Sequence, residues 1–169
     1  ACAKIADIKR QYARSEVKIV LITNSTLLHK PKVQEGLAIL DVNNGEIWAK
    51  LDAGSEQYYR VVNRSEVSFS KVIDNILRTA QKRPLKIQSL FMNILGQGPD
   101  EKEVNAYIKQ LNYLKNNGAE IISVQIHTVA RQPAESFVGP LSDIEIDLIA
   151  DQVREKTSLI VEQYYGSKL

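Results

Sequence analysis

Short runs of aliphatic and β-branched residues alternate along this chain with longer segments of helical periodicity. The runs expected to form strands are 18–22, 46–53, 85–92, 121–129 and 159–165. The intervening segments carry apolar residues three and four positions apart, as on one face of a helix. Strands joined by long crossovers pair in parallel, because a tight turn joins only antiparallel neighbours. The alternation predicts an α/β fold with about five mostly parallel strands, either an open doubly wound sheet or a partial (βα) barrel.

Capping residues mark where the expected helices begin. Ser55, Asp100 and Ser142 each precede a helical segment and can accept hydrogen bonds from its first N–H groups. Glu145 stands three residues after Ser142, which completes a capping-box pattern. The helices are expected at 1–14, 31–40, 55–62, 69–81, 100–115 and 142–154.

Composition and charge indicate one globular domain over residues 1–169. Hydrophobic residues make up 44% of the chain and charged residues 25%, both close to globular averages. The net charge of +2 comes from 22 basic and 20 acidic residues, which disfavours a nucleic-acid partner. The single cysteine, Cys2, excludes an internal disulfide, and no apolar run is long enough to span a bilayer. We therefore expect a cytoplasmic location and no membrane partner.

Polar residues occupy one parity of the expected strands. In the second strand Ile47, Ala49 and Leu51 alternate with a second set that includes Lys50 and Asp52. Side chains alternate between the two faces of a sheet, so one face is apolar and the other polar. The residues expected on the polar face are Asn24, Lys50, Asp52, Gln88, Gln125, His127 and Glu162.

Most of these polar residues fall toward the carboxyl ends of their strands, where barrels and open α/β sheets bind ligands. A ligand pocket is the favoured interpretation, because a structural core gains little by burying Lys50, Asp52 and His127 together. The alternative is that the polar groups satisfy one another as structural bonds. His127 is expected to line the pocket and not to bind a metal, since the other histidine, His29, stands in a loop. Arg131, directly after the fourth strand, can hold an anionic group.

Three segments together resemble the middle of a radical S-adenosylmethionine (SAM) core. In the branch that includes the wyosine-type tRNA-modifying enzymes, a strand ending in T-N-G is followed by S-L-D-A and then by an N-R-P-like loop. The corresponding segments, in the same order, are Thr23-Asn24-Ser25, Lys50-Leu51-Asp52-Ala53 and Asn63-Arg64-Ser65. Segment 124–131, V-Q-I-H-T-V-A-R, corresponds to a late barrel strand.

The resemblance implies that the chain is a fragment of a TIM-type barrel, with helices outside and the early strands missing. The family holds a [4Fe-4S] cluster on a C-x-x-x-C-x-x-C loop, which is absent from these 169 residues. The parent protein is then expected to cleave SAM to a 5′-deoxyadenosyl radical, acting on a substrate that the sequence does not identify. The fragment alone is expected to hold neither cofactor and to be inactive. The resemblance implies that Asn24, Lys50 and Asp52 line the SAM side of the pocket, with Lys50 in place of the family's serine. Strand parity, and no motif match, adds Gln88, Gln125 and His127, and the expected cofactor-binding residues also include Ser25 and Arg131.

Two other functions fit the same residues: a non-redox domain that binds a small ligand, and a regulatory or interaction domain without chemistry. A truncated barrel would also leave the strand at 18–22 as an exposed edge, and such edges pair readily with other chains. We therefore expect self-association, or else the leading helix at 1–14 folded over that edge.

Overall fold

Five parallel strands form the central sheet of the computed structural model, which describes residues 1–166. The strand order is β1-β2-β3-β5-β7, and every neighbouring pair is parallel. The predicted α/β fold with a parallel sheet is therefore confirmed. Within the described residues β1 and β7 are the two edges of this sheet, which does not close on itself. The strands are β1 (Ile19–Thr23), β2 (Gly45–Lys50), β3 (Leu85–Leu90), β5 (Ile121–His127) and β7 (Val161–Tyr164).

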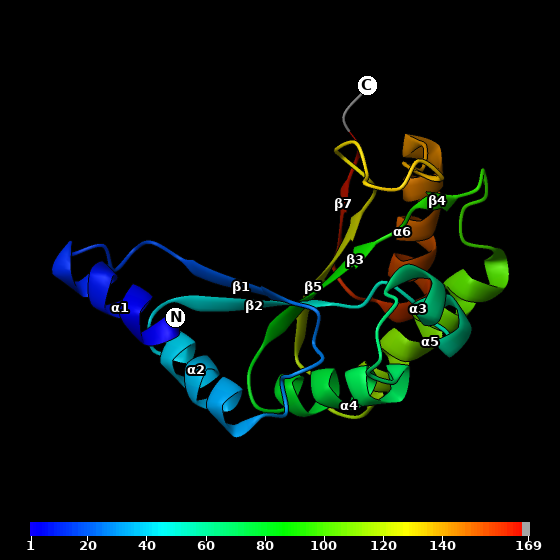
Figure 1. The fold of residues 1–169 in the computed structure, drawn as a ribbon. Coiled ribbons are helices and arrows are strands. Elements are labelled where there is room, and N and C mark those ends of the chain that lie inside the picture. Colours follow the sequence, from blue (N-terminus) through cyan, green and yellow to red (C-terminus); the bar gives the residue numbers. More distant parts are fainter. Residues whose placement is uncertain (167–169) are drawn as a thin grey trace.

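The helices α2, α4, α5 and α6 lie on one side of this sheet, and its other face is left open (Figure 1). Helix α1 packs against α2, and α3 leads into α4. A two-stranded antiparallel ribbon, β4 (Asn93–Ile94) with β6 (Val138–Gly139), was not predicted. The helices are α1 (Cys2–Gln11), α2 (Pro31–Asp41), α3 (Glu56–Val62), α4 (Phe69–Ala80), α5 (Glu101–Asn116) and α6 (Asp143–Thr157).

The capping predictions at Ser55, Asp100 and Ser142 are confirmed. Each side chain accepts a hydrogen bond from a backbone N–H in the first turn of its helix, and Ser142 forms the full capping box with Glu145. Ser68 caps α4 in the same way, which the sequence analysis missed. These bonds fix the points at which the chain turns from the sheet into its crossover helices.

Strand β2 ends at Lys50, three residues before the predicted end. Beyond this point a side chain, in place of the backbone of β2, accepts a hydrogen bond from β3. Leu51 still donates its N–H to the carbonyl of Gln88, at 3.0 Å. The next N–H on β3, that of Leu90, is bound instead by the carboxylate of Asp52, at 2.9 Å. The chain leaves the sheet at this carboxylate and enters α3 through the buried Ala53 and Gly54.

The covered face of the sheet forms the main core. Ile47, Ala49, Ile87, Val124 and Ile126 are each at most 3% exposed and belong to one cluster with helix residues. The helix side of that cluster includes Leu37, Leu40, Val72, Ile76, Leu111, Ile146 and Val153. Burial of this apolar area supplies the main driving force for the fold.

The leading helix, α1, packs against α2. Lys9 of α1 donates through Nζ to the carbonyl oxygens of Val17 and Asn43, at 2.5 and 2.7 Å. On the open face of β1, Val20 remains 39% exposed and Ile22 53%. Within residues 1–166 no helix is long and apolar enough to cross a membrane.

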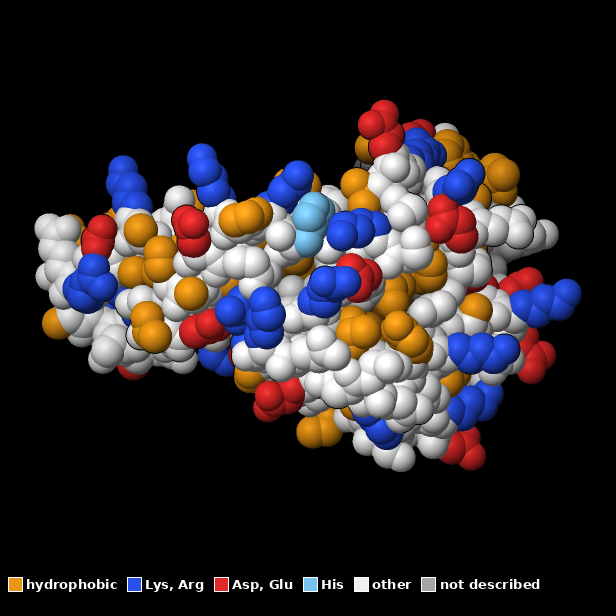
Figure 2. All heavy atoms as spheres, turned by 90° about the horizontal axis from the view of Figure 1, so that it is seen from below, with side chains coloured by type: hydrophobic (Ala, Val, Ile, Leu, Met, Phe, Trp, Pro, Cys, Tyr) orange, Lys and Arg blue, Asp and Glu red, His pale blue; other side chains and the backbone are white. Residues whose placement is uncertain are grey.

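Basic and acidic side chains are interspersed on the face that Figure 2 shows, which includes the helices at the bottom of Figure 1. Hydrophobic side chains lie between them. The view shows no continuous basic surface, in keeping with the near balance of charge in the sequence.

Candidate functional site

Four polar side chains lie side by side on the open face, one from each of four neighbouring strands. The strand register pairs Lys50 with Gln88, Gln88 with Gln125, and Gln125 with Glu162. Gln88 Nε2 is 3.5 Å from Gln125 Oε1, and Gln125 Nε2 is 3.3 Å from Glu162 Oε2. Together with Asp52 and His127, which lie just beyond at the carboxyl ends of β2 and β5, we call these residues the polar row. The alternation seen in the sequence therefore brings them together as expected.

Asp52 is the best-anchored member of the polar row. Its residue is 4% exposed, and its carboxylate accepts from the N–H of Leu90 and from Asn63 Nδ2, at 2.9 and 3.1 Å. Lys50 Nζ lies 3.2 Å from Asp52 Oδ1, with 29% of the lysine side chain exposed. A charge buried to this degree is stable only when it is paired and hydrogen-bonded. Asp52 thus holds the Lys50 ammonium at the open surface.

His127 ends β5 beside this ion pair, and its ring stacks on Tyr164 with centroids 4.4 Å apart and planes 5° from parallel. Burial lowers the pKa of His127 from its ordinary value, and the positive charge of Lys50 lowers it further. Asp52 and Glu162 act in the opposite direction but do not reverse the shift. The imidazole is therefore neutral near pH 7.

Two buried polar atoms around Asp52 have no hydrogen-bond partner among the described residues. They are Nε2 of His127 and Oδ1 of Asn63. Buried polar atoms are usually paired, so this acceptor and this ring nitrogen, at the same carboxyl end of the sheet, are available to bond with water or with a polar ligand. The sequence analysis did not place Asn63 in the pocket, although it lies in the segment that resembles the N-R-P-like loop.

A second set of charges crosses the open face closer to the amino ends of the strands. Lys86 Nζ lies 3.6 Å from both Glu46 Oε1 and Glu162 Oε1, and 5.9 Å from the ring centroid of Trp48. Lys18 Nζ pairs with Glu46 Oε2 at 2.6 Å. Of these residues, Lys86, Glu46 and Lys18 were not predicted from the sequence. Their strand parity is that of the polar row, so the same alternation could have found them.

The predicted residues outside the polar row have different surroundings. Asn24 is exposed, and its Oδ1 accepts from the N–H and hydroxyl of Thr26. Ser25 is fully buried, with Oγ 3.4 Å from the carbonyl oxygen of Lys50, so it borders the row. Arg131 is exposed. Arg64, in the segment that resembles the N-R-P-like loop, pairs with Glu135 at 2.9 Å.

A cavity of about 530 Å³ lies elsewhere, between α3 and the start of α5. Its buried acid, Glu103, accepts hydrogen bonds from the backbone N–H of Gly54 and from the N–H and hydroxyl of Ser55. Burial, with the charges of Glu103 and Asp100, raises the pKa of Tyr58 to about 12. The carboxylate of Glu103 is thus committed to joining α5 to the start of α3.

Comparison with known proteins shows similarity at the level of fold. No family model matches the chain. A curated protein, GTPase Obg of Brachyspira hyodysenteriae, is 20% identical over 165 residues, but the chain spans only 23% of its length. A solved structure, a domain of pyruvate-formate lyase-activating enzyme from Bacteroides vulgatus, aligns with 96% of this chain and 90% of its own, at a TM-score of 0.64 and 14% identity. The chain therefore has an α/β fold like that of this activating-enzyme domain.

Proposed function

We propose that this chain is the C-terminal part of a radical SAM (βα) barrel and that its polar row forms the SAM side of the ligand pocket. The observation that carries the proposal is the alignment of Lys50, Gln88, Gln125 and Glu162 at one level of the open face. Ligands bind at the carboxyl ends of the strands in barrels and in open α/β sheets. The fold similarity over 96% of the chain supports this assignment.

The described residues do not fit an iron–sulfur cluster. The chain has one cysteine, Cys2, and no group of three or more His, Cys, Asp or Glu residues within 1–166 can hold a metal ion. The three-cysteine loop would belong to a part of the parent protein outside this chain. The parent would cleave SAM reductively to a 5′-deoxyadenosyl radical, and this chain alone would be inactive.

The polar row itself would bind and orient SAM, and we propose that it does so in this chain alone, in contrast to the sequence-based expectation that the fragment holds neither cofactor. The Lys50 ammonium, fixed by Asp52, can bind a carboxylate, and the carboxamides of Gln88 and Gln125 can bond to ribose hydroxyls. The neutral His127 offers its unpaired Nε2 to the same ligand. None of these contacts requires a charge change at pH 7, so binding and orientation would be the contribution of this chain.

GTP hydrolysis is not proposed, despite the similarity to a GTPase. The 169 residues contain no G-x-x-x-x-G-K-[ST] segment, the loop that cradles nucleotide phosphates. The Gly96–Asp100 loop instead positions Asp100 to cap α5, as a plain turn does.

Trp48 provides a direct test of SAM binding. It is the only tryptophan in the chain and lies on the open face, two residues before Lys50. Titration with SAM should give a saturable change in Trp48 fluorescence, matched by calorimetry, whereas ADP should not. Lys50→Met should raise the dissociation constant by about tenfold or more, because a charged hydrogen bond is lost.

Lys71→Met is the matched control, since it removes the same charge from the outer helix α4. It should leave SAM binding unchanged. Absence of any response of the native chain to SAM, or an equal loss in both variants, would overturn the proposal. Incubation of the chain with iron and sulfide tests the cluster statement separately: a stable iron–sulfur absorption band would contradict it.

A further inference from the structure

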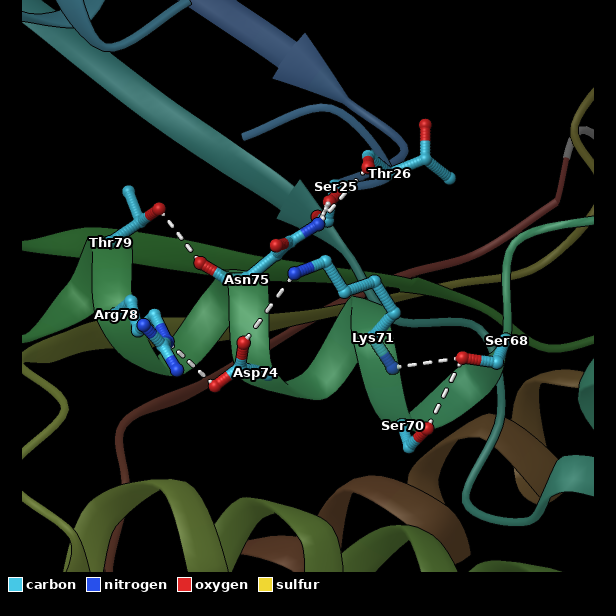
Figure 3. A network of polar contacts seen from close by, with 9 residues as sticks. All are labelled: Ser25, Thr26, Ser68, Ser70, Lys71, Asp74, Asn75, Arg78 and Thr79. Atoms are coloured by element: carbon cyan, nitrogen blue, oxygen red, sulfur yellow. Dashed lines mark hydrogen bonds and ion pairs between the residues drawn. The ribbon is translucent and has the colours of Figure 1, made fainter. Parts of the chain in front are cut away.

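A buried asparagine on α4 reaches across to the loop that follows β1. Asn75 is 1% exposed, and its Nδ2 donates to the carbonyl oxygens of Ser25 and Thr26, at 2.9 and 3.0 Å. Figure 3 shows this side chain pointing from α4 to the loop, whereas its neighbour Asp74 points to Arg78 and Lys71. One carboxamide thus binds two consecutive backbone carbonyls about 50 residues away in sequence.

The loop that Asn75 binds has an unusual backbone. Ser25 adopts φ = 65°, the left-handed region that favours glycine. The N–H groups of Ser25 and Thr26 are bound by the side chains of Thr23 and Asn24, at 3.1 and 3.3 Å. The carbonyl groups of the same two residues accept from Asn75. Each of these backbone polar groups therefore has a partner, and the strained turn is held from both sides.

The turn places Ser25 and Asn24 at the border of the polar row. Ser25 Oγ lies 3.4 Å from the carbonyl oxygen of Lys50, the residue that begins the row. A different backbone conformation at Ser25 would move this hydroxyl and the exposed Asn24 relative to Lys50. The geometry of the turn therefore shapes one wall of the candidate site.

The bonding of Asn75 is suited to positioning more than to general stability. Two carbonyl oxygens can accept only from the NH₂ group, so the orientation of the carboxamide is fixed. Its Oδ1 then has no hydrogen-bond partner among the described residues, although it is buried. A half-satisfied buried amide is a poor stabilising device compared with an apolar side chain, so the two bonds to the loop are its distinguishing contribution.

We infer that Asn75 is a positioning residue for the candidate site: it sets the left-handed turn at Ser25 and, through it, the wall beside Lys50, without touching the ligand. The inference rests on the proposed function only for the identity of that ligand, SAM. The state of the turn can be measured without ligand.

Two variants of Asn75 test the inference. Asn75→Asp keeps the shape and replaces the donors with oxygens that repel the two carbonyls, and Asn75→Leu is a second variant in case the first does not fold. Either should increase amide hydrogen exchange at Ser25 and Thr26 by about tenfold or more, because two buried carbonyls lose their partner and the turn is released. Amides within α4, such as that of Ile76, should keep their protection, and the SAM dissociation constant should rise.

Thr79→Val is the matched control. Thr79 is equally buried on the same helix, and its hydroxyl bonds to the backbone carbonyl of Asn75, at 2.8 Å, and not to the loop. It should leave both loop exchange and SAM binding unchanged. Adding Ser25→Gly to the Asn75→Leu chain tests the strain directly: glycine adopts φ = 65° without cost and should recover part of the amide protection of Thr26.

Unchanged loop exchange in a folded Asn75 variant, or equal effects of Thr79→Val, would overturn the inference. If the native chain does not respond to SAM, the proposed function fails, and loop exchange alone then decides whether Asn75 sets the turn.

Discussion

The two faces of the central sheet are built from the same strands and differ in almost every physical respect. On the covered face, Ile47, Ile87 and Ile126 are at most 3% exposed and pack among the helices. On the open face, Lys50, Gln88, Gln125 and Glu162 lie across the sheet at one level, and most of their bonds are long or partly exposed. A parallel sheet buried on both faces has apolar residues in both parities. The polar parity here therefore indicates that the open face is specialised for something other than packing.

The largest contrast is expected between adjacent residues of β3. Ile87→Ala should lower the free energy of unfolding by about 2–5 kcal/mol, because it leaves a cavity in the covered core. Gln88→Ala should lower it by less than about 1 kcal/mol, because its one side-chain bond is 3.5 Å long. Chemical denaturation of the two variants measures both. Equal losses would mean that the open face contributes to folding as much as the core does.

The sequence could predict this contrast because strand alternation is a local property. The parity of Lys50 and Gln88 follows from counting along each strand, and the caps at Ser55, Asp100 and Ser142 follow from residues three positions apart. These features do not depend on what else the chain contacts.

Features that depend on distant segments could not be predicted in this way. Asn75 interrupts the apolar stripe of Val72, Ile73 and Ile76 on α4, but nothing local shows that it binds Ser25. The β4–β6 ribbon pairs two-residue segments some 45 residues apart, too short to leave a pattern. The fold comparison then supports the fold part of the family resemblance, while the barrel and its chemistry remain proposals.

A smaller loss is expected at Asp52, where the open face contains its one well-buried charge. Asp52→Asn keeps the shape but removes the charge that pairs with Lys50 and weakens the bonds from Leu90 and Asn63. We expect a loss of about 1–3 kcal/mol in the free energy of unfolding. The double variant with Lys50→Met should lose less than the two single losses combined, because the two residues interact. Additive losses would show that the pair is not coupled.

The pH dependence of stability gives a finer test of the open face. The pKa of folded His127 is lowered from 6.5, so below about pH 6.5 the unfolded chain takes up a proton before the folded chain does. The contribution of the neutral His127 to the free energy of unfolding is therefore fully present above about pH 6.5. It is lost as the pH falls toward the lower pKa of the folded chain. His127→Gln should reduce this loss. Lys50→Met should raise the pKa of His127, since Lys50 contributes to lowering it.

Imidazole proton resonances in an NMR titration measure the pKa of His127 directly. The chain has two histidines, so the His29→Gln variant assigns them. A pKa of His127 at or above 6.5 in the native chain would contradict the statement that burial and the charge of Lys50 lower this pKa.

The smallest effect on stability, and a separate effect on association, is expected at the β1 edge. Ile22 is 53% exposed on the open face of an edge strand, so Ile22→Lys should change the free energy of unfolding by less than about 0.5 kcal/mol. The unpaired backbone groups of an edge strand pair readily with another chain, and a lysine on the strand opposes this. If the chain self-associates through β1, sedimentation at increasing concentration should show oligomers in the native chain and fewer in Ile22→Lys. Val42→Lys, at the end of α2 with 82% of Val42 exposed, should not reduce them. A native chain that stays monomeric at all concentrations would show that the open edge does not by itself drive association.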